Sequence, residues 1–325
     1  MSEPLPVLGD WRAPRWLPGG NAQTIWPALL SRRPPAPAWR RERWDTPDGD
    51  FVDVDFIDAS TIAAPALVLL HGLEGSSRSH YAVAFAHWAR RAGWRFAVPH
   101  WRGCSGEANR LPRAYHSGDY AEVAWLMVRL RAWAGVPLCV VGVSLGGNAL
   151  LRWAGEVGEQ ASAEVRALAA ISAPLDLAAG GHAIDSGFNR IVYASMFLRT
   201  MKAKALVKLG QFPGLFDRQR MLGARTLYEF DNVVTAPLHG FRDTDDYWSR
   251  ASAKPHLARI RVPTLALNAH NDPFVPQASL PPRGTAYVTL WQPAHGGHVG
   301  FPGGAFPGHL MTLPDAVMRW MHELA

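Results

Sequence analysis

The pentapeptide Gly142-Val143-Ser144-Leu145-Gly146 constrains the fold of this chain more than any other feature. It follows the all-apolar run Leu138–Val143, which is typical of a strand buried on both faces, and it opens a helical pattern over Gly146–Trp153. A strand that turns at once into a helix needs a tight turn, and glycines two positions before and after Ser144 permit one. The sequence therefore predicts a strand, a strained turn and a helix, with the Ser144 hydroxyl above the edge of a sheet.

The same alternation of apolar runs and helical patterns continues along the chain. It predicts an α/β fold with a mostly parallel central sheet flanked by helices. The expected strands are Trp39–Trp44, Phe51–Ile57, Ala66–Leu70, Trp94–Val98, Leu138–Val143, Ala167–Ser172, Arg261–Asn268 and Ala286–Trp291. Helices are expected over Tyr81–Ala92 and from about Tyr120, with Ser117 as the N-cap, and over Leu313–Leu324 at the end of the chain.

Two segments depart from this alternation within an expected single domain of residues 1–325. Residues 1–37 are rich in proline, which forbids long helices, and are expected to wrap the domain as an N-terminal arm. Residues from about 175 to 250 look helical and carry no strand pattern. An insertion of this kind in mid-sheet predicts a helical cap over the site.

Bulk composition narrows the classes of function. Hydrophobic residues make up 48% of the chain and charged residues 18%, so a large core can form. The formal net charge is +6, but no basic run exceeds two residues, and we expect no nucleic-acid partner. The two cysteines and an N-terminus without a secretory pattern predict a cytoplasmic protein. Apolar runs are strand-sized, so no transmembrane segment is expected.

A serine hydroxyl becomes a useful nucleophile only beside an imidazole base that a carboxylate holds in place. Of the thirteen histidines, His298 lies between glycines after the last expected strand, where such a base belongs. His295, three residues earlier in the same loop, is the rival and could also assist.

The carboxylate is expected in the loop after Arg261–Asn268, because the chain order in this kind of sheet is serine, acid, histidine. Asp272 is the acid in that loop. Asp176 follows a strand too early in the chain, and Glu107 precedes the serine. An Asx-turn before Pro273 is the alternative role for Asp272.

Two backbone N–H groups should stabilise an oxyanion. One is the amide of Leu145, directly after the serine, and the other is the amide of Leu73, in the loop that follows Ala66–Leu70. Candidate substrate contacts are His71 and Glu74 in that loop and Met196 and Phe197 in the expected cap. Each candidate also has an alternative role. His71 would shape the loop, and Glu74 would have a structural role or lie at the rim of the site. Met196 and Phe197 would pack in the core of the cap.

The sequence contains no common motif for binding a metal or a cofactor. It contains no Cys-x-x-Cys, no His-Glu-x-x-His, no phosphate loop and no dinucleotide fingerprint, so we expect neither a metal nor a cofactor.

Several motifs in the same order resemble the YheT-like branch of the α/β-hydrolase family, which is related to plant embryogenesis-associated hydrolases and animal abhydrolase-domain enzymes. They are Asn21-Ala22-Gln23-Thr24, His71-Gly72-Leu73-Glu74-Gly75, residues 101–107, residues 115–118, residues 142–148, residues 241–247 and residues 295–301. The resemblance implies the α/β-hydrolase fold, a triad of Ser144, Asp272 and His298, and esterase activity on short acyl esters or monoacylglycerols. Some animal relatives carry a His-x-x-x-x-Asp motif associated with acyl transfer, which none of the histidines here matches.

The sequence thus predicts a serine esterase (EC 3.1.1.-) that cleaves short- to medium-chain carboxylic esters through an acyl-enzyme on Ser144. An acyltransferase, thioesterase or lipase on the same triad, and a non-catalytic binding protein on this scaffold, are the alternatives. A transient contact with a lipid surface is a further alternative, suggested by three lysines of the expected cap: Lys202, Lys204 and Lys208.

Overall fold

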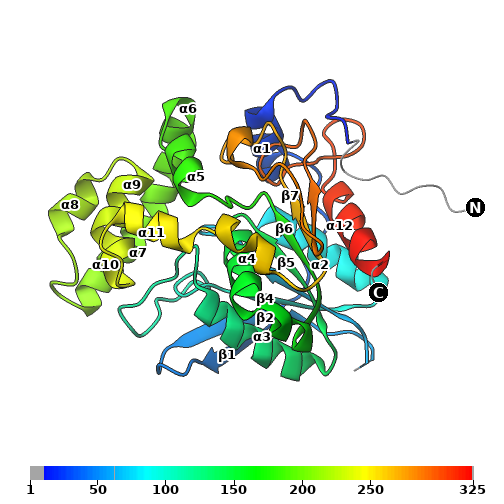
Figure 1. The fold of residues 1–325 in the computed structure, drawn as a ribbon, viewed down its shortest axis with the longest axis horizontal. Coiled ribbons are helices and arrows are strands. Elements are labelled where there is room, and N and C mark those ends of the chain that lie inside the picture. Colours follow the sequence, from blue (N-terminus) through cyan, green and yellow to red (C-terminus); the bar gives the residue numbers. More distant parts are fainter. Residues whose placement is uncertain (1–10, 62, 324–325) are drawn as a thin grey trace, which may run out of the picture.

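The structure, a computed structural model, describes residues 11–61 and 63–323. Eight strands form one sheet in the order β1-β2-β4-β3-β5-β6-β7-β8. The pairs β1–β2 and β2–β4 are antiparallel, and every other neighbouring pair is parallel. The expected α/β fold with a mostly parallel sheet and flanking helices is confirmed (Figure 1).

The strands are β1 (Arg40–Asp45), β2 (Phe51–Ile57), β3 (Ala66–Leu70), β4 (Arg95–Pro99), β5 (Leu138–Val143), β6 (Val165–Ile171), β7 (Thr264–Leu267) and β8 (Val288–Trp291). The α-helices are α1 (Gly20–Leu29), α2 (His80–Ala92), α3 (Tyr120–Ala134), α4 (Leu145–Val157), α5 (Leu177–Ile184), α6 (Gly187–Asn189), α7 (Ser195–Gln211), α8 (Arg218–Gly223), α9 (Leu227–Phe230), α10 (Ala236–Leu238), α11 (Thr244–Ala251) and α12 (Thr312–Glu323). Short 3₁₀ turns span Gly158–Ala163, Lys254–Arg259 and Gln277–Ser279, and π-helical turns span Arg190–Ala194 and Asp231–Thr235.

Alternate residues of each central strand face opposite layers of helices. In β3, Val68 and Leu70 pack in the core that holds α3 and α4, whereas Leu67 and Leu69 pack in the core that holds α2 and α12. Burial on both faces explains why these strands read as continuous apolar runs.

The start of α3 differs from the sequence prediction. Asp119, not Ser117, is the N-cap, and its side chain accepts a hydrogen bond from the backbone N–H of Glu122. Ser117 lies two residues earlier, where its backbone N–H donates to the Tyr247 hydroxyl of α11 at 2.9 Å. Both residue types cap helices, so the sequence alone did not separate them.

Helices α5 to α11 lie between β6 and β7 in the chain and gather beside the sheet, at the left of Figure 1, on the side away from α12. This cap has an apolar cluster of its own. Its buried members are Leu198, Ala205, Met221, Ala224, Leu227, Phe230 and Val234.

Asp231, in this cap, makes stability depend on pH. Its carboxylate accepts hydrogen bonds from Thr235 Oγ1 at 2.6 Å and Trp248 Nε1 at 2.9 Å, and burial raises its pKa from 3.8 to about 6. The folded state therefore holds this proton more tightly than the unfolded state. The resulting stabilisation is complete below about pH 4 and is lost as pH rises through about 6.

Replacing Asp231 with asparagine should flatten this dependence, because the amide does not titrate. Between pH 4 and pH 7 the wild type should lose on the order of 2 kcal/mol more in free energy of unfolding than the variant. Urea unfolding of both proteins across this range measures the difference, and parallel pH curves would contradict the assignment.

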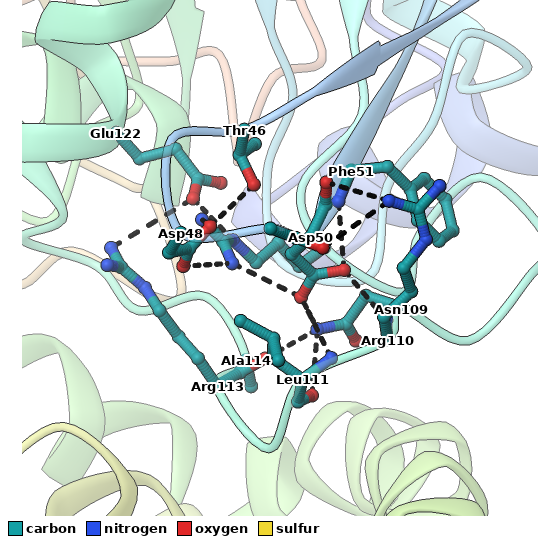
Figure 2. Close-up of polar contacts among 12 residues, drawn as sticks. Thr46, Asp48, Asp50, Phe51, Asn109, Arg110, Leu111, Arg113, Ala114 and Glu122 are labelled. Atoms are coloured by element: carbon teal, nitrogen blue, oxygen red, sulfur yellow. Dashed lines mark hydrogen bonds and ion pairs between the residues drawn. The ribbon is translucent and has the colours of Figure 1, made fainter.

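Asp50, in the turn between β1 and β2, anchors the loop of residues 100–118, which forms one wall of the site (Figure 2). Its carboxylate is fully buried. Its two oxygens accept hydrogen bonds of 2.6–3.2 Å from the backbone N–H groups of Phe51, Arg110 and Leu111, from Asn109 Nδ2 and from Arg102 Nη1.

The Asp50→Ala variant should be destabilised by about 3–5 kcal/mol, because it leaves the Arg102 charge and several N–H donors buried with fewer partners. Asp45→Ala is the matched control. Asp45 pairs with Arg110 at 2.8 Å but its side chain is 75% exposed, so its loss should cost less than about 1 kcal/mol. Urea unfolding of the two variants tests this contrast, and equally small effects would refute it.

Candidate active site

Ser144 lies on a strained turn between β5 and α4. Its φ is 52° and its ψ −119°, a left-handed region that non-glycine residues rarely enter. Its backbone N–H donates to Ile171 O of β6 at 2.8 Å, which holds the turn against the neighbouring strand. A Cβ at Gly146 would lie 2.3 Å from Leu70 O, and one at Gly142 would lie 2.6 Å from Gly146 O. The glycines on either side are therefore what permits the turn.

Ser144 lines a cavity of about 600 Å³ between the end of the sheet and the cap. The cavity wall is mostly apolar. Its apolar lining residues include Leu73, Leu145, Pro174 and Phe274 on one side, with Leu177, Phe197, Met201, Leu227, Phe230, Val234 and Leu238 from the cap.

His298 and Asp272 form a contact pair. Nδ1 of His298 lies 2.9 Å from Asp272 Oδ2 and 3.2 Å from Oδ1. The Asp272 side chain is fully buried, and its Oδ1 also accepts the backbone N–H groups of Phe274 at 2.8 Å and Val275 at 3.3 Å. A carboxylate at Nδ1 keeps the proton on that nitrogen and leaves Nε2 as the acceptor of a neutral imidazole.

The loop that carries His298 reaches the end of the sheet next to Ser144. The backbone N–H of Val299 donates to Ser172 Oγ at 3.0 Å, and Ser172 directly follows Ile171, the partner of the Ser144 amide. The ring of Phe274 lies 4.3 Å from the His298 ring, between centroids, and lines the same cavity as Ser144. Through Phe274, the histidine–aspartate pair therefore lies next to the cavity that Ser144 lines.

Two backbone amides at this end of the cavity are free to bind an oxyanion. Leu73 and Leu145 both line the cavity, and within residues 11–61 and 63–323 neither backbone N–H has a hydrogen-bond acceptor. For Leu145 this follows from its place at the first position of α4, where N–H groups lack an intrahelical partner. A Cβ at Gly72 would lie 3.1 Å from Ser144 Cβ, so the Leu73 loop passes close to the serine.

The structure separates the candidate substrate contacts. Glu74 and Phe197 line the cavity, whereas Met196 lies on the surface with 47% of its area exposed. His71 is fully buried: Trp101 N–H donates to its Nε2 at 3.2 Å, and its Nδ1 donates to Gly72 O at 2.9 Å. Burial lowers the pKa of His71 to about 3, so the ring is neutral and holds the loop. The structure does not bring His71 or Met196 into the cavity.

The rival base and acids make other contacts, although Glu107 also lines the cavity. His295 is exposed and its Nδ1 lies 3.5 Å from Asn271 Nδ2. Asp176 caps α5 through a hydrogen bond from the N–H of Ala179, and Glu107 forms an ion pair with Arg43 at 3.0 Å.

Sequence reasoning missed the role of α1 in holding the histidine loop. Gln23 Oε1 accepts the N–H of Gly296 and Nδ2 of Asn271, both at 2.9 Å. Thr24 Oγ1 accepts the N–H of His298 at 2.8 Å. The sequence predicted only an arm that wraps the domain, and the motif over residues 21–24 was the one signal that pointed to these polar side chains.

No group of three histidine, cysteine, aspartate or glutamate side chains within residues 11–61 and 63–323 is arranged to hold a metal ion. In the same ranges, every helix is too short or too polar to cross a bilayer.

Comparison with known proteins agrees with the observed fold. Residues 65–305 match the model of the alpha/beta hydrolase fold family. YheT of Escherichia coli (strain K12), a protein whose name describes an esterase, is 39% identical over 93% of this chain and 89% of its own length. Phospholipase ABHD3 of Mus musculus is 27% identical over 98% of this chain and 80% of its own.

Among solved structures, the esterase Pf2001 of Pyrococcus furiosus matches with a TM-score of 0.52 at 15% identity, covering 90% of this chain and 96% of that one. This likeness concerns the fold.

Proposed function

The chain belongs to the alpha/beta hydrolase family, and from that premise we propose that it is a serine esterase in which Ser144 forms the acyl-enzyme. The observation that carries the proposal is one cavity lined by a strained serine and by two residues with free N–H groups, with a carboxylate-held imidazole packed against Phe274 of the cavity wall. These are the parts that acyl transfer to a hydroxyl requires.

The mechanism follows from these parts. His298 Nε2 takes the Ser144 proton as Oγ attacks the ester carbonyl, and the N–H groups of Leu73 and Leu145 bind the oxyanion. His298 then gives the proton to the departing alcohol. Water attacks the acyl-enzyme by the same route and releases the acid. Asp272 keeps the imidazole in the required tautomer and stabilises its positive charge.

The apolar lining of the cavity favours a substrate with an apolar acyl group. Its cap side is formed by aliphatic and aromatic side chains, and burying each methylene is worth about 0.8 kcal/mol. We therefore assign acyl esters of short to medium chain as substrates. The names of the esterase and phospholipase relatives also describe hydrolases of this chemical kind.

Hydrolysis of p-nitrophenyl acetate, butyrate and octanoate tests the proposal. We expect kcat/KM to rise by a few-fold per added methylene until the cavity is filled. Added primary alcohols would divert the acyl group if acyl transfer were the main reaction, so product analysis with and without glycerol separates the two. If the protein hydrolyses none of these esters, the result favours the alternative of a non-catalytic binding protein on this scaffold.

A further inference from the structure

The backbone around Leu73 is held from both sides. The N–H of Gly72 donates to the hydroxyl of Tyr81 at 3.0 Å, and the N–H of Glu74 donates to the hydroxyl of Tyr115 at 3.0 Å. Glu74 has a φ of 56°, a left-handed conformation that costs a non-glycine residue on the order of 1 kcal/mol. Its surroundings must therefore supply the interactions that keep it there.

The Glu74 carboxylate makes those interactions with two distant elements. Oε1 accepts hydrogen bonds from the Tyr115 hydroxyl and from Lys204 Nζ, both at 2.8 Å. The Glu74 side chain is only 8% exposed, so the carboxylate depends on these partners more than a surface carboxylate would.

Lys204 belongs to α7 of the cap and lies 130 residues from Glu74 in the chain. Its Nζ also contacts Cys104 Sγ at 3.2 Å. Burial raises the pKa of the Cys104 thiol to about 11, so this contact carries no negative charge at neutral pH. Glu74 is therefore the charged partner of Lys204, and the pair joins the cap to the loop that presents the Leu73 amide.

Two other lysines of α7 make contacts of a different kind. Lys202 Nζ donates to Leu222 O at 2.8 Å and Ala224 O at 2.5 Å, both within the cap. Lys208 Nζ donates to Asn109 O at 2.5 Å and Leu111 O at 2.6 Å, in the loop after β4. Lys208 thus ties the cap to the sheet domain without touching the Leu73 loop.

We propose that the Lys204–Glu74 ion pair is a positioning contact that couples the seating of cap helix α7 to the orientation of the Leu73 amide. The inference rests on the proposed function, since it assigns that amide to oxyanion binding. Without Lys204 the carboxylate loses its cation in a mostly buried place and turns toward water, which releases both the Tyr115 bond and the left-handed backbone. The oxyanion site is then complete only when the cap is seated.

Kinetics of variants at three lysines separate this role from simple tethering. Lys204→Met should lower kcat by about tenfold or more, with a smaller change in KM, because a misplaced donor weakens the transition state most. Lys204→Arg should restore most of the rate. Lys202→Met should leave the rate unchanged, and Lys208→Met should change kcat much less than Lys204→Met. Glu74→Gln should resemble Lys204→Met, and the double variant should be no slower than the slower single one.

A trifluoromethyl ketone, which forms a tetrahedral adduct with the serine, should lose affinity in Lys204→Met by about the factor lost in kcat. The matching methyl ketone, which mimics the substrate, should bind as in the wild type. Equal losses for both ketones would show a general disturbance of the cavity and overturn the proposal.

Hydrogen exchange of the peptide that covers residues 72–77 gives a readout that needs no activity. It should speed up in Lys204→Met and stay as in the wild type in Lys208→Met, which should instead loosen residues 107–113. Unchanged exchange in residues 72–77 of Lys204→Met, or effects of Glu74→Gln and Lys204→Met that multiply, would overturn the coupling. A wild type without esterase activity would refute the proposed function, and the exchange result would still decide whether Lys204 orders the loop.

Discussion

Replacing Ser144 with alanine should lower kcat/KM for p-nitrophenyl butyrate by at least about 10³-fold, because alanine has no hydroxyl to attack the ester. The change should leave the fold intact. The Ser144 side chain does not cap α4, and the backbone hydrogen bond to Ile171 remains. Alanine also has no more difficulty than serine at a φ of 52°.

Circular dichroism and thermal unfolding of this variant provide the control, and we expect a melting temperature close to that of the wild type. A variant that folds normally and keeps more than a tenth of the activity would remove Ser144 from the mechanism.

Replacing Asp272 with asparagine should lower kcat by about 10²- to 10⁴-fold. The amide oxygen can still accept the N–H groups of Phe274 and Val275, so the loop keeps its shape. Its NH₂ group, however, then faces His298 Nδ1 and makes that nitrogen an acceptor. The proton moves to Nε2, and the imidazole can no longer accept the serine proton.

Asp176→Asn is the matched control, because it changes an acid that the sequence also offers as a candidate. Asparagine caps a helix as well as aspartate does, so α5 should persist and the rate should stay within about twofold of the wild type. Comparable losses in the two variants would contradict the assignment of Asp272.

Local sequence patterns predicted the framework of the site because its parts depend on neighbours in the chain. The turn at Ser144 needs small residues two positions away, and glycines stand there. The pairing of Asp272 with His298 followed from strand order, and the structure places the two side chains in contact at 2.9 Å. Their catalytic roles stay predictions until the variants are measured.

Contacts between segments that lie far apart in the chain could not be predicted from the sequence. Nothing in the pattern around Lys204 indicates a partner 130 residues away, because that pairing depends on how α7 docks on the sheet domain. The same holds for Gln23 and Thr24, whose side chains hold a loop more than 270 residues further along the chain. The sequence also offered His71 as a substrate contact, although the close packing of its loop against Trp101 buries the ring.

Identification of the residue that an active-site-directed fluorophosphonate modifies tests the proposed nucleophile most directly. The reagent forms a stable tetrahedral adduct with an activated serine, and peptide mass spectrometry locates that adduct. We expect one adduct per chain, on the peptide that contains Ser144, and none on the Ser144→Ala variant. Modification of another residue, or equal labelling of wild type and variant, would contradict the claim that Ser144 is the nucleophile.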